Sequence, residues 1–132
     1  MSAVIEKPRS VYAIFCEATK RIYIGVSANP EVSIKTKLRS AKGLNDYCKN
    51  HPKELSRLGP FERDYDKYGE AAFTPYLLEV NVPAEKADER KWHWISEYNA
   101  TDPKYGYNGR GGERVEFMLG LPENRFKKDS EA

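Results

Sequence analysis

The sequence is poor in the residues that build metal centres and disulfide frameworks. It has only two cysteines and two histidines among 132 residues. Cys16 and Cys48 form no C-x-x-C pair, and two histidines are too few for an ordinary zinc site. We therefore expect no zinc site and predict that both thiols are reduced and structural.

Long hydrophobic runs are also absent. No apolar stretch approaches the roughly 18 residues of a membrane-spanning helix, and no signal-peptide pattern is visible at the N-terminus. We therefore expect a cytoplasmic protein without a membrane partner. The length is that of one ordinary domain, and 39% of the residues are hydrophobic, which is enough for a modest core.

A large net charge is missing too, because the chain carries only +2. The charges are nevertheless unevenly distributed. Residues 1–60 contain 11 Lys and Arg against 5 Asp and Glu, a net charge of +6, whereas the remainder contains 11 against 15, a net charge of −4. Such asymmetry suits a surface that meets phosphates, although it is also common on solvated surfaces.

The first half of the sequence predicts a hairpin and a helix. Residues 10–16 and 21–27 are rich in β-branched and aromatic residues, and a short polar segment that reads as a turn separates them. Asn29-Pro30 then predicts a helix start, since Asn caps helices and Pro favours the first helical position. This helix is expected to run to about Lys42 and to end at Gly43.

The second half predicts two more helices and a strand. Residues 61–68 can form a helix that Gly69 terminates, and residues 83–98 form another. Between them, residues 73–80 are expected to be a strand, and Pro75 within it favours a sheet edge or a bulge. The order predicts an α+β fold, a small three-stranded antiparallel sheet flanked by helices.

Two tyrosine motifs lie one on each strand of the predicted hairpin. Val11-Tyr12 and Tyr23-Ile24-Gly25 resemble the paired signature of the GIY-YIG nuclease superfamily, with Ser10-Val11 in place of the family's Gly-Ile. The other matching segments are Lys67-Tyr68-Gly69 with Phe73, Leu77-Leu78-Glu79, Trp94-Ile95 with Tyr98-Asn99, and Gly106-Tyr107-Asn108 with Gly111-Gly112. The closing turn in particular resembles that of phage homing endonucleases. The predicted domain spans residues 10–113, between an N-terminal segment (1–9) and a C-terminal extension (114–132).

The resemblance implies a nuclease chemistry whose catalytic groups are mostly replaced here. Members of the superfamily hydrolyse phosphodiesters with a tyrosine, a glutamate that holds one divalent cation, and an arginine and a histidine or tyrosine on the first helix. Tyr12 and Tyr23 match the tyrosines. Ser33, Lys37 and Lys91 stand at the positions of the arginine, the histidine and the glutamate. An ammonium at the glutamate position repels a cation, so we expect vestigial tyrosines, no metal ligand and no cofactor.

A basic row on the first predicted helix indicates the partner. We expect DNA or RNA as the ligand of this catalytically degenerate domain. The residues predicted to contact it are Lys35, Lys37, Arg39, Lys42, Asn108 and Arg110.

Two alternative functions fit the same sequence. In the first, the domain binds a host protein and acts as an inhibitor or adaptor of a defence or nucleic-acid-processing factor. In the second, it is an active Mg²⁺-dependent endonuclease in which Glu89 replaces the lost glutamate, because Glu89 and Trp92 reproduce the family's E-x-x-W spacing. Glu89 is turned about 160° from Lys91 on a helix, which disfavours this alternative.

Overall fold

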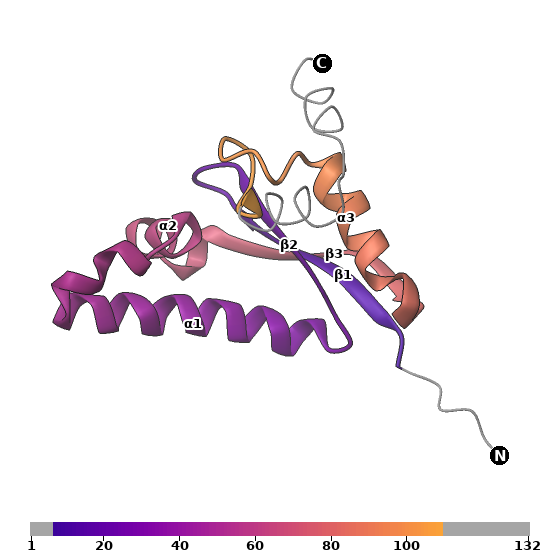
Figure 1. The fold of residues 1–132 in the computed structure, drawn as a ribbon, viewed down its shortest axis with the longest axis horizontal. Helices are drawn as coiled ribbons and strands as arrows, with labels where there is room; N and C mark the ends of the chain where they lie inside the picture. Colours follow the sequence, from indigo (N-terminus) through magenta and orange to yellow (C-terminus); the bar gives the residue numbers. More distant parts are fainter. Residues whose placement is uncertain (1–6, 110–132) are drawn as a thin grey trace.

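The structure, a computed structural model, describes residues 7–109 and contains one three-stranded antiparallel sheet with helices on both sides (Figure 1). The strand order is β2-β1-β3, so β1 is central. The strands are β1 (Arg9–Cys16), β2 (Arg21–Ser27) and β3 (Phe73–Val82), the α-helices are α1 (Pro30–Asn50), α2 (Pro60–Tyr68) and α3 (Ala87–Glu97), and the short 3₁₀ helices are η1 (Pro52–Arg57), η2 (Glu70–Ala72) and η3 (Ala84–Lys86). The predicted α+β fold is therefore confirmed.

Strands β1 and β2 form the predicted hairpin. Their register runs from Ser10 opposite Ser27 to Cys16 opposite Arg21. The four-residue turn closes with Lys20, whose φ of 63° lies in the left-handed region and whose N–H donates to the Cys16 carbonyl at 2.8 Å. Strand β3 pairs with the other side of β1 and lies at the sheet edge, as Pro75 predicted.

The two faces of the sheet belong to two separate cores. Because side chains alternate along a strand, Tyr12 and Ile14 of β1 project to one face and Val11 and Ala13 to the other. Helices α1 and α2 cover the first face, whereas α3, centred on Ile95, covers the second (Figure 1). The sheet thus separates everything on α1 and α2 from everything on α3.

Helix α1 is longer than predicted, because Gly43 does not end it. The helix continues to Asn50, and a Cβ at Gly43 would meet open space. Beyond the glycine, Asn45 and Cys48 are buried, and the Asn45 amide donates to the carbonyls of Ala41 and Glu62. A glycine costs a helix only about 1 kcal/mol relative to alanine. The burial of Asn45 and Cys48 and the bond from Asn45 to Glu62 of α2 therefore outweigh the tendency of Gly43 to end the helix.

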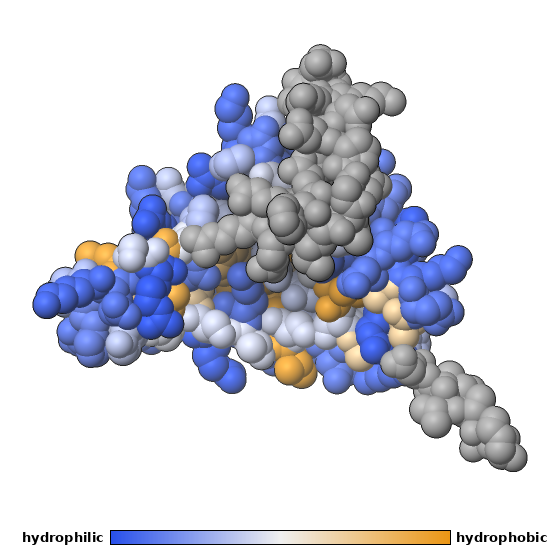
Figure 2. All heavy atoms as spheres, viewed as in Figure 1, coloured by the Kyte–Doolittle hydropathy of each residue, from blue (hydrophilic) through white to orange (hydrophobic). Residues whose placement is uncertain are grey.

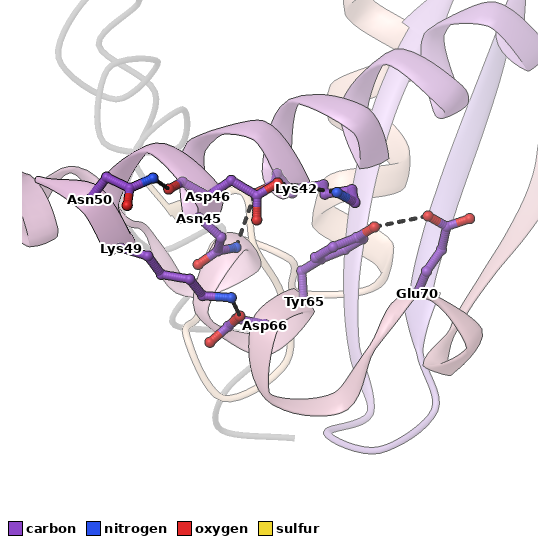
Figure 3. A network of polar contacts seen from close by, with 9 residues as sticks. Lys42, Asn45, Asp46, Lys49, Asn50, Tyr65, Asp66 and Glu70 are labelled. Atoms are coloured by element: carbon purple, nitrogen blue, oxygen red, sulfur yellow. Dashed lines mark hydrogen bonds and ion pairs between the residues drawn. The ribbon is translucent and has the colours of Figure 1, made fainter.

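Helix α2 agrees closely with the prediction, whereas α3 begins later. Gly69 ends α2 with a φ of 84°, in the left-handed region that glycine favours. The predicted helix over residues 83–98 starts instead with the 3₁₀ helix η3, and its α-helical part spans Ala87–Glu97. Helices α1 and α2 pack beside each other, and Lys49 of α1 forms an ion pair with Asp66 of α2, while Lys42 pairs with Asp46 within α1 (Figure 3).

The free edge of β2 is covered by the turn that follows α3. Ile22 donates to the Tyr105 carbonyl at 3.0 Å and accepts from the Tyr107 N–H at 2.9 Å. Next to it, the Asn108 carboxamide accepts from the Ile24 N–H at 3.0 Å and donates to the Ile24 carbonyl at 2.9 Å. The side chain of Asn108 thus continues the pairing that the backbone of the turn begins.

We predict that Asn108→Ala destabilises the fold by about 1–3 kcal/mol, because it removes both partners of the Ile24 backbone. Urea unfolding measures the loss as a lower midpoint with an unchanged slope. Asn50→Ala is the matched control, since this exposed amide makes a single 3.4 Å bond, and its effect should stay within about 0.5 kcal/mol. Equal effects of the two substitutions would contradict the edge role of Asn108.

Candidate functional site

The two tyrosines of the paired motif lie together on the α1 face of the sheet. Tyr12 is opposite Gly25 and Ile14 is opposite Tyr23, so the tyrosines are diagonal neighbours, with ring centroids 6.3 Å apart. A Cβ on Gly25 would come within 2.5 Å of the Tyr12 ring and hydroxyl. The glycine of Tyr-Ile-Gly therefore makes room for the ring of Tyr12 to lie across β2.

Lys37 of α1 reaches the same place. Its Nζ lies 4.3 Å from the centroid of the Tyr23 ring and 4.7 Å from that of Phe61 on α2. Burial lowers the pKa of Lys37, while the nearby Glu62 carboxylate acts in the opposite direction. We call these five residues, Tyr12, Tyr23, Lys37, Phe61 and Glu62, the tyrosine–lysine cluster.

Both tyrosine hydroxyls of the cluster keep their protons near neutral pH. Burial raises the pKa of Tyr12, and the neighbouring Tyr23 hydroxyl raises it further. Burial also raises the pKa of Tyr23, with the Tyr12 hydroxyl lowering it and Glu62 adding to the rise. Neutral phenols donate hydrogen bonds, and the Tyr12 hydroxyl, which is buried, donates to that of Tyr23. The cluster therefore offers the ammonium of Lys37 and the O–H of Tyr23 to an anionic ligand.

The sequence indicated the tyrosines and Lys37 but not their neighbours from α2. Phe61 packs edge-on against Tyr23, with centroids 5.9 Å apart. The Glu62 carboxylate accepts from the Gly59 N–H at 3.0 Å at the start of α2. A glutamate three positions after the residue that precedes a helix, as Glu62 is after Gly59, is a signal for the start of a helix. The sequence does not indicate, however, that α2 folds back onto α1.

Ser33, at the position of the family's arginine, has a local role. Its hydroxyl donates to the Ser27 hydroxyl at 2.6 Å, and the Ser27 hydroxyl also accepts from the Asn29 N–H at 3.0 Å. These bonds tie the first turn of α1 to the end of β2. Ser33 therefore fixes the direction of α1, which carries Lys37 to the cluster.

The two candidate positions on α3 lie on the other side of the sheet. Glu89 is exposed, and Lys91 is partly buried, with its Nζ 5.4 Å from the centroid of the Trp92 ring. Because α3 packs on the face opposite the tyrosines, the structure does not bring either residue to the cluster. Tyr98, which directly follows α3 and belongs to one of the segments that resemble the family, is 44% exposed and stacks on Trp94.

The basic row on α1 divides between two faces of the helix. Lys37 is turned about 200° from Lys35, at 100° per residue, so it points toward the sheet while Lys35, Arg39 and Lys42 are exposed. Lys42 is bonded to Asp46 at 3.1 Å (Figure 3). The outer face thus presents fewer unengaged cations than the sequence suggested.

Asn108 and Arg110 of the closing turn were predicted to contact nucleic acid, and the structure gives Asn108 a structural role. The Asn108 carboxamide uses its oxygen and its nitrogen on the Ile24 backbone. Arg110 lies outside the residues that the structure describes, as does the predicted C-terminal extension.

A second surface feature is an apolar groove between the start of α1 and β3. Its volume is about 500 Å³, and exposed apolar side chains contribute to its walls, among them Val32 at 61% and Leu77 at 58% exposure. Apolar atoms interrupt the hydrophilic surface near the N-terminal end of α1 (Figure 2). The lining residues are Asn29, Pro30, Glu31, Val32, Ile34, Pro75, Tyr76 and Leu77.

Comparison with known proteins yields no relative. The chain matches no protein-family model, and no curated protein or solved structure is significantly similar to it. Within residues 7–109, no group of three or more His, Cys, Asp or Glu side chains is arranged to hold a metal ion. No helix in this part of the chain is both long and apolar enough to span a membrane. Cys16 and Cys48 are free and buried.

We predict that Gly25→Ala destabilises the fold by about 1–3 kcal/mol, because the added methyl collides with the buried Tyr12 ring. The cost should fall by at least about 0.5 kcal/mol in the Tyr12→Leu background, where the ring is gone. Chemical denaturation of the single and double variants measures both numbers.

Gly43→Ala is the matched control for this prediction. A methyl there meets no atom within 4 Å, and it should stabilise the fold by about 0.5–1 kcal/mol, since alanine favours a helix interior. If Gly25→Ala costs the same with and without the Tyr12 ring, the clash is not the reason for this glycine.

Proposed function

We propose that this chain binds nucleic acid through a GIY-YIG-like domain that has lost the catalytic groups of that family. The observation that supports it best is the position of Lys37. Its ammonium is packed against the rings of Tyr23 and Phe61, and no carboxylate of residues 7–109 forms an ion pair with it. Cation–π contacts offset only part of the cost of desolvating such a charge.

A phosphate would complete the surroundings of this ammonium. Its oxygens can accept from Lys37 and from the protonated hydroxyl of Tyr23. On the outer face of the same helix, Lys35 and Arg39 are exposed and form no ion pair within the described part of the chain. These groups suit a backbone ligand, which carries phosphates at regular intervals.

We predict that the chain binds a fluorescently labelled DNA duplex with an affinity that falls steeply as salt rises. Lys37→Met should weaken this binding and reduce the slope of log Kd against log salt by about 1, because one phosphate contact is lost. Fluorescence anisotropy at several salt concentrations gives both quantities.

Lys86→Met is the matched control, since Lys86 is exposed on the α3 side of the sheet. It should leave affinity and slope unchanged. Salt-independent binding, or an equal loss in the two variants, would contradict the proposal. The duplex should also be recovered intact in Mg²⁺, whereas cleavage that Glu89→Ala abolishes would support the active-endonuclease alternative.

The apolar groove favours a second candidate function, the binding of a protein. Val32 and Leu77 expose more than half of their surface in the groove, and exposed apolar patches of this kind mark interaction sites. A host protein inhibited or recruited by this chain would bury these side chains.

We predict that a partner of this kind, captured from nuclease-treated host lysate, is lost in Leu77→Asp but retained in Leu55→Asp. Leu55 is 49% exposed and lies on η1, outside the groove. A charge placed in an apolar interface is strongly unfavourable, so only the groove variant should release the partner. Retention by both variants, or loss in both, would show that the groove is not the binding surface.

A further inference from the structure

The apolar groove beside α1 contains the two most exposed large hydrophobic side chains of the described residues. Val32 of α1 exposes 61% of its surface, and Leu77 of β3 exposes 58%. Tyr76 lines the same groove at 47% exposure, and Val80 follows on the same strand at 51%. Apolar side chains that gather in one place, rather than being scattered singly, mark a surface that another molecule covers.

The groove continues a core that is already present. Pro75 and Leu77 lie opposite Ile14 and Tyr12 of β1, so they project to the face of the sheet that α1 and α2 cover. The middle of this face is buried, whereas the outer strand β3 is left open beside the first turns of α1. Ile34 connects the two regions, because it lines the groove and also packs against the core. A molecule seated in the groove therefore extends this core.

Two opposite charges lie on α1 beside the groove. Glu31 lines it and Lys35 follows one turn later, and both side chains are exposed. Neither forms an ion pair with any residue in the described part of the chain, including the other. Lys7, at the same end of α1, donates to the Asn29 carboxamide at 2.8 Å.

This mixture of charges restricts what fits the groove. The phosphates of a nucleic acid would meet the carboxylate of Glu31, and a partner of a single charge would meet its own sign at Glu31 or at Lys35. The matching surface has an apolar centre with the same two charges in reverse order. A second copy of this chain presents that surface.

We propose that the groove is the interface of an isologous dimer, in which both copies contribute the same surface. Val32 and Leu77 of each copy pack into the groove of the other, and Glu31 of each copy pairs with Lys35 of the other. Lys37 is turned about 140° from Val32 at 100° per residue, so the second copy meets a different side of α1 and leaves the tyrosine–lysine cluster uncovered. The dimer goes beyond the proposed binding of nucleic acid and does not depend on it.

Sedimentation equilibrium of the full-length chain, freed of nucleic acid, tests the proposal. The apolar surface is small for a dimer interface, so we expect a reversible monomer–dimer equilibrium with a Kd on the order of 10 µM. Val32→Asp and Leu77→Asp should each raise the Kd at least about tenfold, since both copies then bury an unpaired carboxylate. Leu55→Asp is the matched control, because Leu55 is 49% exposed on η1 outside the groove, and its Kd should stay within about twofold.

An exchange of charges tests the pairing without altering the apolar centre. Glu31→Lys alone and Lys35→Glu alone each place like charges opposite one another, and each should raise the Kd at least about fivefold. A mixture of these two variants should form a heterodimer with a Kd within about twofold of the unsubstituted chain, because every contact again joins a lysine and a glutamate. Lys86→Glu makes the same change of charge on the α3 side of the sheet and should leave the Kd unchanged.

The outcomes that overturn the dimer are specific. They are a chain that stays monomeric up to about 1 mM, a dimer that Val32→Asp and Leu77→Asp leave intact, and variants at 31 and 35 that fail to associate when mixed. A monomeric chain that retains a host protein through Leu77 would also overturn the dimer, and would assign the groove to that protein. The mixing experiment remains decisive if an aspartate in the groove unfolds the chain. Duplex binding is measured separately by anisotropy, so failure of the dimer leaves the proposed function intact.

Discussion

Everything in this domain depends on the central strand β1, which is buried on both faces and paired along both edges. Successive side chains from Val11 to Ile14 are almost fully buried, and each belongs to the core opposite that of its neighbour. A shift of one residue in register would exchange the two cores completely. This alternation places Tyr12 under α1 and α2, and it also places α3 on the other side of the sheet.

The sequence was sufficient where a local rule decides the structure. The hairpin, the end of α2 at Gly69 and the edge position of β3 follow from strand composition, turn residues and proline chemistry. It was insufficient where contacts between distant segments decide. Gly43 is a reasonable helix end by itself, but the amide of Asn45 binds α2 and carries the helix through it.

The same distinction between local rules and contacts of distant segments applies to the candidate site. The tyrosine motifs identified Tyr12 and Tyr23, and the structure brings them together. Lys37 was predicted both at the position of the family's histidine and as part of a basic surface, and the turn of the helix directs it inward to Tyr23 and Phe61. The amide of Asn108, predicted to contact a ligand, instead completes the edge of β2. Residue type could be read from the sequence, whereas the direction of each side chain required the packing of the helices.

The closed edge of β2 has a consequence for how copies of this domain could associate. The turn over residues 105–108 occupies the backbone groups of Ile22 and Ile24, so a new strand cannot pair with this stretch of β2, whereas β3 is the other outer strand of the sheet. A sheet that extends in one direction can be continued once, by a second copy related by a two-fold axis, and then has no further site for growth. The covered stretch of β2 is thereby protected from edge-to-edge pairing, and Asn108, which the sequence had assigned to a ligand, shares this role with the backbone of Tyr105 and Tyr107.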